Sequence, residues 1–252
     1  MKAFSASYRN EWDKLIRRRK YPVFLFIGIG LCLLWAGLGR LISAFVKQQG
    51  GFSFTLAATP MGVLPFFLQV MLPFLIFMAI TDSITVEGSD NTMKAMIYRP
   101  VERWKLYTAK LLAVVTYAAL YLLCVFVVCL LLSSLAGAGL SADAALRALA
   151  SYALTLIPLT ILACFASLIA LLGKSGTLTM FLLLLSYLLL NVLPVFFPIL
   201  SEMLFTSYLS WYRLWIGALP GLPKLIHMLL IVLGSGTVFY TAGSLLFERK
   251  EY

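Results

Sequence analysis

One short fragment of the sequence carries the residue types of two catalytic motifs. Gly173-Lys174-Ser175-Gly176 matches the GxSG motif of intramembrane serine proteases. A serine nucleophile needs a histidine base within hydrogen-bond reach, and His227 is the only histidine in the chain. Ser175 lies at the cytoplasmic end of its predicted helix, whereas His227 lies near the opposite face of a hydrocarbon layer about 30 Å thick. The sequence therefore predicts no proteolytic site.

The same fragment contains the Gly-Lys-Ser that ends a phosphate-binding loop. The complete motif, GxxxxGK[ST], requires a glycine at position 168 and a strand before the loop. Leu168 stands at that position, inside a long apolar run. We therefore predict no nucleotide site and no catalytic residues, and expect Lys174 and Ser175 to close a tight turn.

The cysteines and the polar residues of the apolar runs offer little further chemistry. All four cysteines lie inside apolar runs without CxxC spacing, so neither a metal site nor a disulfide framework is predicted. The predicted spans contain no acidic residue, which disfavours ion-coupled transport. Their polar groups Tyr187 and Asn191, together with Gln69, are our candidates for a translocation path.

The composition indicates that the elements holding these residues are membrane helices. Of the 252 residues, 62% are hydrophobic and 12% are charged, against about 45–50% and about 25% in soluble domains. A membrane-spanning helix needs about 20 apolar residues. The sequence thus predicts an all-α membrane protein with six transmembrane helices. The predicted spans are Pro22–Val46, Met61–Thr81, Leu111–Leu135, Leu149–Leu172, Thr177–Leu200 and Leu225–Phe247.

The basic residues indicate how these helices are oriented. The net charge is +10, and the basic residues flank the apolar runs, so we interpret them as a topology signal and expect no nucleic-acid partner. With both termini in the cytoplasm, 15 of the 20 Lys and Arg residues lie on the cytoplasmic side and five on the other. We expect a multi-pass protein of a bacterial plasma membrane, in contact with the lipid bilayer.

The first 21 residues have the pattern of an amphipathic helix. Trp12, Leu15 and Ile16 belong to an apolar stripe at helical spacing, and charged residues cover the other side. Such a helix lies in the headgroup plane, with Trp at the interface and cations toward anionic lipid. We therefore divide the chain into an amphipathic interfacial helix, 1–21, and a six-span transmembrane domain, 22–252.

The predicted cytoplasmic loop 82–110 has the pattern of a short docking helix. Ser89 or Asp90 would cap this helix, and Pro100 would end it. Flexible methionine side chains suit an irregular groove on a partner protein. The alternative is that the helix packs against the protein's own helix ends. The apolar face would consist of Met93, Met96 and Ile97.

The predicted outer loop 201–223 is too apolar for a solvated loop and too short to span a bilayer. It contains Trp211, Tyr212 and Trp215. We predict a re-entrant or interfacial segment with its aromatic rings at headgroup depth. An aromatic belt without a role in transport is the alternative.

With these features in place, the sequence resembles the membrane subunit of ABC-2 type exporters, the type V exporter fold, over essentially its whole length. The segment Glu11-Trp12-Asp13-Lys14-Leu15 is similar to that family's elbow helix. The stretch from Glu87 to Lys110 is similar to its cytoplasmic coupling signature, with Ser89–Asn91 as an insertion. That signature has an acidic residue before a helix start, then Pro-x-x-Arg, then a lysine that enters the third span.

The resemblance implies an ATP-driven function. A second permease subunit, identical or related, would pair with this one, and a separate ATPase subunit holding ATP and Mg would dock on each. This chain would be no enzyme and would bind no cofactor itself. The implied activity is export of an amphipathic or lipid-like substrate (a peptide, drug or lipid), including the antimicrobial-peptide immunity and drug-export types. The resemblance and the helix pattern of the loop together predict the docking residues Glu87, Asp90, Thr92, Met93, Lys94, Met96, Ile97, Pro100 and Arg103.

Two other functions remain open at this point. A secondary transporter would use an ion gradient in place of ATP. A membrane scaffold or sensor would use the cytoplasmic loop to recruit a partner without transporting anything.

Overall fold

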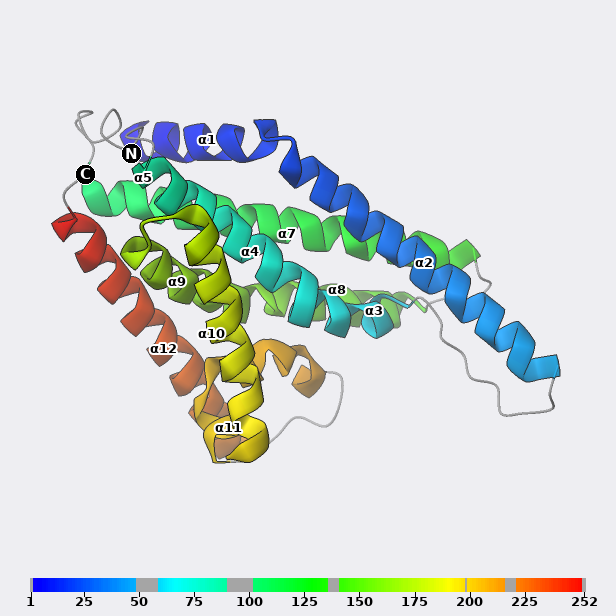
Figure 1. Cartoon of the computed structure of the whole chain (residues 1–252). Helices are drawn as coiled ribbons and strands as arrows, with labels where there is room; N and C mark the ends of the chain where they lie inside the picture. Colours follow the sequence, from blue (N-terminus) through cyan, green and yellow to red (C-terminus); the bar gives the residue numbers. More distant parts are fainter. Residues whose placement is uncertain are drawn as a thin grey trace.

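The computed structural model describes residues 2–48, 59–89, 102–135, 141–197, 199–215 and 221–250, and this part of the chain is helical without a strand (Figure 1). Both chain ends lie at one end of the bundle, which we call the termini end (Figure 1). The elements in chain order are α1 (Lys2–Arg17), α2 (Lys20–Gln48), α3 (Pro60–Phe66), η1 (Phe67–Met71), α4 (Leu72–Ile80), η2 (Thr81–Val86), α5 (Glu87–Ser89), α7 (Arg103–Leu135), α8 (Ala142–Leu154), α9 (Leu156–Leu172), α10 (Gly176–Phe196), α11 (Leu200–Met203), η3 (Phe205–Trp215) and α12 (Leu222–Arg249).

Within the described residues, six segments are long and apolar enough to cross a membrane, which confirms the predicted fold class. The third and fourth begin several residues before the predicted limits, because their helices continue past the apolar windows into charged and small residues. The second likewise continues past its predicted end at Thr81. The six segments are Lys20–Leu41, Pro60–Val86, Arg103–Leu135, Ala142–Leu172, Gly176–Phe196 and Leu225–Arg249.

The second span is one helical column that changes its hydrogen-bond pattern twice. It begins at Pro60, whose fixed φ suits the first helical position, and the Thr59 hydroxyl accepts from the Gly62 N–H at 3.2 Å. Two π-helical stretches, η1 and η2, interrupt the α pattern. Pro73 has no N–H to give to the carbonyl of Gln69 four residues earlier. The Tyr187 hydroxyl donates to that carbonyl instead, at 3.0 Å.

This hydrogen bond gives Tyr187 and Gln69, two of the predicted path residues, a structural role that a substitution can test. We expect Tyr187→Phe to lower the free energy of unfolding by about 1 kcal/mol, since the Gln69 carbonyl loses a donor. In a Pro73→Ala background, which restores the backbone N–H, the same change should cost less. A double-mutant cycle on thermal unfolding in detergent measures the difference. Equal costs in both backgrounds would contradict this account.

The protein core lies where α4, α7 and α9 meet. Leu75, Val114 and Leu162 are among its fully buried side chains. The first, fifth and sixth spans are peripheral, because only 17%, 11% and 6% of their apolar windows are buried. Their remaining apolar surface suits lipid or another membrane subunit.

The aromatic residues of the predicted outer loop pack inward. Segment η3, a 3₁₀-helix, contacts α8, α9 and α12. Trp211 and Tyr212 are 4% and 3% exposed, and the Phe205 ring contacts the rings of Phe165 and Phe239 at tilted and edge-on angles. These rings are therefore buried among helices of the protein, and their predicted place at headgroup depth stays a prediction. Aromatic content alone does not separate a lipid-facing ring from a ring buried among other helices.

Candidate functional site

Helix α1 is held against α7 by its apolar side. The Tyr8 hydroxyl donates to Thr116 at 3.1 Å, and the Trp12 ring lies 6.3 Å from that of Tyr117. Leu15 is buried, whereas Ile16 is 46% exposed and faces away from the bundle. Of the predicted stripe, Trp12 and Leu15 thus contact the protein and Ile16 does not.

The same helix brings charge into the termini end of the bundle. The Lys110 ammonium on α7 is fully buried and lies 2.9 Å from the Glu11 carboxylate and 2.6 Å from the Glu87 carboxylate. Lys14 lies 3.0 Å from each of the same two carboxylates. We call Glu11, Lys14, Glu87 and Lys110 the ion cluster. Its two acids and two bases join α1, α5 and α7.

The two lysines of the ion cluster keep the Glu87 carboxyl ionised. Burial alone would raise the pKa of the Glu87 carboxyl, but the ammonium groups of Lys110 and Lys14 outweigh it and hold that pKa below its ordinary value. Glu87 therefore stays ionised near neutral pH. A buried pair of this kind strongly resists loss of one partner, because the other charge would remain buried and uncompensated.

The lowered pKa predicts how stability depends on pH. A carboxyl whose pKa is lower folded than unfolded stabilises the fold above the unfolded value and loses that contribution as pH falls through the folded value. The unfolding midpoint of the purified protein should therefore fall on acidification below about pH 4.3, the ordinary glutamate range. Glu87→Gln should be less stable at pH 7 and show a flatter profile. Parallel profiles for the two proteins, measured by scanning fluorimetry, would rule out Glu87 as the responsible group.

A second group of charges adjoins the ion cluster. The buried Asp82 carboxylate accepts a hydrogen bond from the Tyr21 hydroxyl at 2.7 Å and pairs with Arg18 at 3.4 Å and with Lys20. The other guanidinium nitrogen of Arg18 lies 3.7 Å from Glu87. Arg18 therefore bridges Asp82 to the ion cluster.

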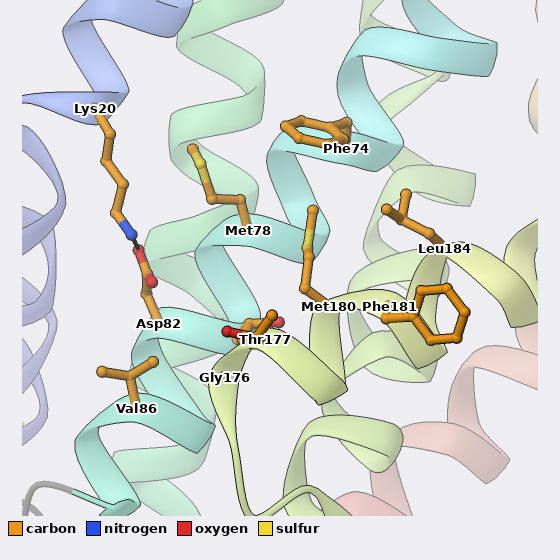
Figure 2. Close-up of a pocket in the computed structure, with 11 residues that line it drawn as sticks. Lys20, Phe74, Met78, Asp82, Val86, Gly176, Thr177, Met180, Phe181 and Leu184 are labelled. Carbon is orange, nitrogen blue, oxygen red and sulfur yellow. Dashed lines mark ion pairs between the residues drawn. The ribbon is translucent and has the colours of Figure 1, made fainter.

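Asp82 forms part of the wall of a cavity of about 670 Å³ between the second and fifth spans (Figure 2). Lys20 lines it from the start of α2, and Met78 and Phe74 continue the wall along α4. The start of α10 forms the opposite side. A Cβ atom on Gly176 would lie 2.8 Å from the Val86 side chain, so this glycine lets α10 begin close to η2.

The predicted docking residues divide into two groups. Glu87 lies in the ion cluster and Arg103 at the start of α7. Ser89 is the last residue of α5, and the residues that it would cap lie outside the described part of the chain. The others lie outside the described residues: Asp90, Thr92, Met93, Lys94, Met96, Ile97 and Pro100.

Arg103 has a structural partner that the sequence does not indicate. Its guanidinium donates to the carbonyl of Glu248 at 2.6 Å and of Lys250 at 3.4 Å. Carbonyls at the end of a helix have no partner within it. Arg103 thus caps the end of α12 and ties the third span to the sixth.

The candidate path residues Gln69, Tyr187 and Asn191 also come together. Tyr187 joins the Gln69 carbonyl, and the Asn191 amide donates to the Tyr187 carbonyl at 2.8 Å. Leu184 on the same helix lines the cavity, one turn closer to the termini end.

The predicted location of two charged residues is wrong. The sequence places Asp82 and Lys110 in a predicted loop, but Asp82 lies in the helical column of the second span and Lys110 in that of the third. A prediction from hydropathy places the end of a span at the first charged residue. The helix itself continues past that residue when the charge has a partner in the folded protein. The sequence carries one weak signal, an excess of bases over acids: residues 1–126 hold six acids and 14 bases, so each acid has several candidate partners.

The described residues include no group of three or more His, Cys, Asp or Glu side chains that could hold a metal ion. Ser175 begins α10 at the termini end, and His227 lies near the start of α12 at the other end of the bundle (Figure 1). The charged side chains of the ion cluster and of Asp82 at the termini end are engaged in ion pairs.

These features define a helical membrane subunit with a cavity and a buried ion cluster at one end. The chain matches the sequence profile of the ABC-2 family transporter proteins over residues 8–191, and it belongs to that family. A search of curated proteins found no significant match. The protein is therefore a multi-pass permease of the ABC transporter class, whose members work with ATPase subunits.

Proposed function

We propose that this chain is the permease subunit of an ATP-driven exporter, which moves an amphipathic or lipid-like substrate out of the cytoplasm or the membrane. The cavity between the second and fifth spans carries this proposal. It combines a charged end at Asp82 and Lys20 with an apolar wall that includes Phe74 and Met78. Such a surface suits a molecule with one polar end and an apolar body.

The distribution of basic residues supports an orientation with both termini in the cytoplasm. Lys and Arg concentrate at the termini end, where α1 and the starts of α2 and α7 lie. The positive-inside rule assigns that end to the cytoplasm. The charged end of the cavity, with Lys20 and Asp82, would then lie on the side from which an exporter takes its substrate, and α1 would lie along the inner headgroup layer.

The ion cluster supports a route by which a partner ATPase acts on the spans. Glu87 stands directly before residues 90–101, which carry the predicted docking face, and it pairs with Lys110 on the third span. Arg18 connects the same glutamate to the cavity wall. ATP and Mg would bind in the separate ATPase subunit, and a second permease, identical or related, would complete the pathway.

The first test is a pull-down of the tagged protein in mild detergent, with mass spectrometry of the partners. We expect an ATPase subunit at a stoichiometric ratio, and ATP-dependent transport after reconstitution of the complex. Transport driven by an ion gradient without ATP would favour a secondary transporter. A bound partner whose ATP hydrolysis never responds to this chain would favour a scaffold or sensor.

A further inference from the structure

At the charged end of the cavity, a ligand could replace one of the partners of Asp82. Asp82 has three donors, namely Tyr21, Arg18 and Lys20. Tyr21 is fully buried, and Arg18 is also paired with Glu87. The side chain of Lys20 is 44% exposed and lines the cavity (Figure 2). Lys20 can leave Asp82 and hydrate at little cost, whereas Tyr21 and Arg18 would still hold the carboxylate in place.

A second acceptor stands beside Asp82. Helical threonines of this chain commonly donate to the carbonyl four residues earlier, as Thr108, Thr116 and Thr160 do. Thr81 lines the cavity and is 5% exposed, but its hydroxyl has no hydrogen-bond partner in the described part of the chain. A buried hydroxyl without a partner costs free energy. A ligand that donates a hydrogen bond there would remove that cost.

The apolar wall defines the remainder of the ligand. Phe74 and Met78 on α4, and Met180, Phe181 and Leu184 on α10, extend away from Asp82 and Gly176 (Figure 2). Eight residues separate Phe74 from Asp82 and Leu184 from Gly176, so each wall is roughly 12 Å long at the helical rise per residue. Methionine and aromatic side chains adapt to apolar bodies of different shapes.

The charge balance favours a cationic head over an anionic one. An anion would have to approach the Asp82 carboxylate, which Tyr21 and Arg18 keep at the wall. A cation would take the place of Lys20, so that one ammonium replaces another. The α10 N-terminus at Gly176 and Thr177 contributes a partial positive charge, but the Thr81 hydroxyl can accept from an ammonium N–H.

We propose that the cavity binds an amphiphile with a single primary ammonium head, held by Asp82 and Thr81, and that Lys20 occupies this position when the substrate is absent. This inference rests on the proposed function, since it names the substrate class for the same cavity. Lys20 is then an internal competitor of the substrate.

The test is binding of radiolabelled decylammonium to the purified chain in neutral-detergent micelles, by scintillation proximity. The extended chain of this probe is about as long as the apolar walls. We expect it to be displaced by unlabelled decylammonium far better than by decanol or decanoate. Asp82→Asn should weaken its binding about tenfold and Thr81→Val by a smaller factor, as expected for loss of a charged and a neutral acceptor.

Lys20→Gln is the decisive variant, because the two head-group charges predict opposite signs. Removal of the competitor should tighten decylammonium binding several-fold and leave decanoate no better bound. Arg147→Gln, which removes one exposed positive charge on α8 far from the cavity lining, should change neither. Weaker decylammonium binding in Lys20→Gln, a preference for decanoate or decanol, or no binding of any probe would overturn the proposal.

A transport measurement tests the proposed function independently of the binding site. Vesicles that contain the complex with its ATPase should move decylammonium only with ATP. Binding with the expected signs but without ATP-dependent movement would leave the binding site standing and reject the exporter. ATP-dependent movement of other amphiphiles, with decylammonium excluded, would keep the exporter and reject the cationic head.

Discussion

Lys110→Met is expected to lower the free energy of unfolding by about 3–5 kcal/mol, the usual cost of removing one partner from a buried ion pair. The substitution keeps an unbranched side chain of similar length and removes only the charge. Glu11 and Glu87, 2% and 5% exposed, would then lose their only fully buried cationic partner among the described residues and keep the partly exposed Lys14, with Arg18 3.7 Å from Glu87. Their mutual repulsion and desolvation should release α1 from α7. Thermal unfolding in detergent, together with protease cleavage within α1, measures both effects.

The same helix offers a matched control for this prediction. Lys105 pairs with Glu102 at 2.9 Å, but the Glu102 side chain is 60% exposed. Surface pairs contribute about 0–1 kcal/mol, so Lys105→Met should have little effect. Adding Glu11→Gln and Glu87→Gln to Lys110→Met should recover part of the lost stability, because no buried charge would then lack a partner. Equal losses for Lys110→Met and Lys105→Met would refute a stabilising role of the ion cluster.

The ion cluster shows why part of the candidate site could not be predicted from the sequence. Glu87 pairs with Lys110, which lies 23 residues later at the far end of the predicted loop. Glu11 lies 99 residues from Lys110, and Lys14 lies 73 residues from Glu87. Nothing local marks such pairs, since each partner alone looks like an exposed charge at a helix end. Their pairing depends on where α1 docks.

Other parts of the molecule could be predicted because their cause is local. An apolar run of sufficient length is helical in lipid wherever it packs, so the six spans follow from the sequence. The periodicity of Trp12 and Leu15 likewise predicts α1, and the structure adds that this face covers α7. The inward packing of Trp211 and Tyr212 depends on α8 and α9, and no pattern within 201–223 reveals it.

The cavity and the ion cluster together indicate how substrate and ATPase could influence each other. Arg18 contacts both Asp82 and Glu87. A ligand that displaces Lys20 from Asp82 would change the partners of Arg18, and a movement of Glu87 would change them from the other side. Two sites that bias one shared element are thermodynamically coupled in both directions.

The largest functional effect is expected from the double substitution Met93→Asp and Ile97→Asp. These residues carry the predicted apolar docking face in the sequence that follows Glu87. Burial of carboxylates in an apolar groove costs several kcal/mol, so association with the ATPase subunit should weaken by about tenfold or more. ATP-dependent transport should be lost, while membrane insertion and the unfolding midpoint stay as in the unmodified protein. Co-purification and ATP hydrolysis of the complex measure the effect.

The matched control is Met93→Leu with Ile97→Leu, which keeps the face apolar and should preserve both association and transport. The stability measurement separates docking from folding, because a face that packs on the protein's own helix ends would lower the unfolding midpoint in the aspartate variant. A normal midpoint with lost association assigns the face to the partner. Undiminished association in the aspartate variant would place the ATPase contact elsewhere. It would also refute the proposal that the ATPase acts on the spans from residues 90–101 through Glu87 and Lys110.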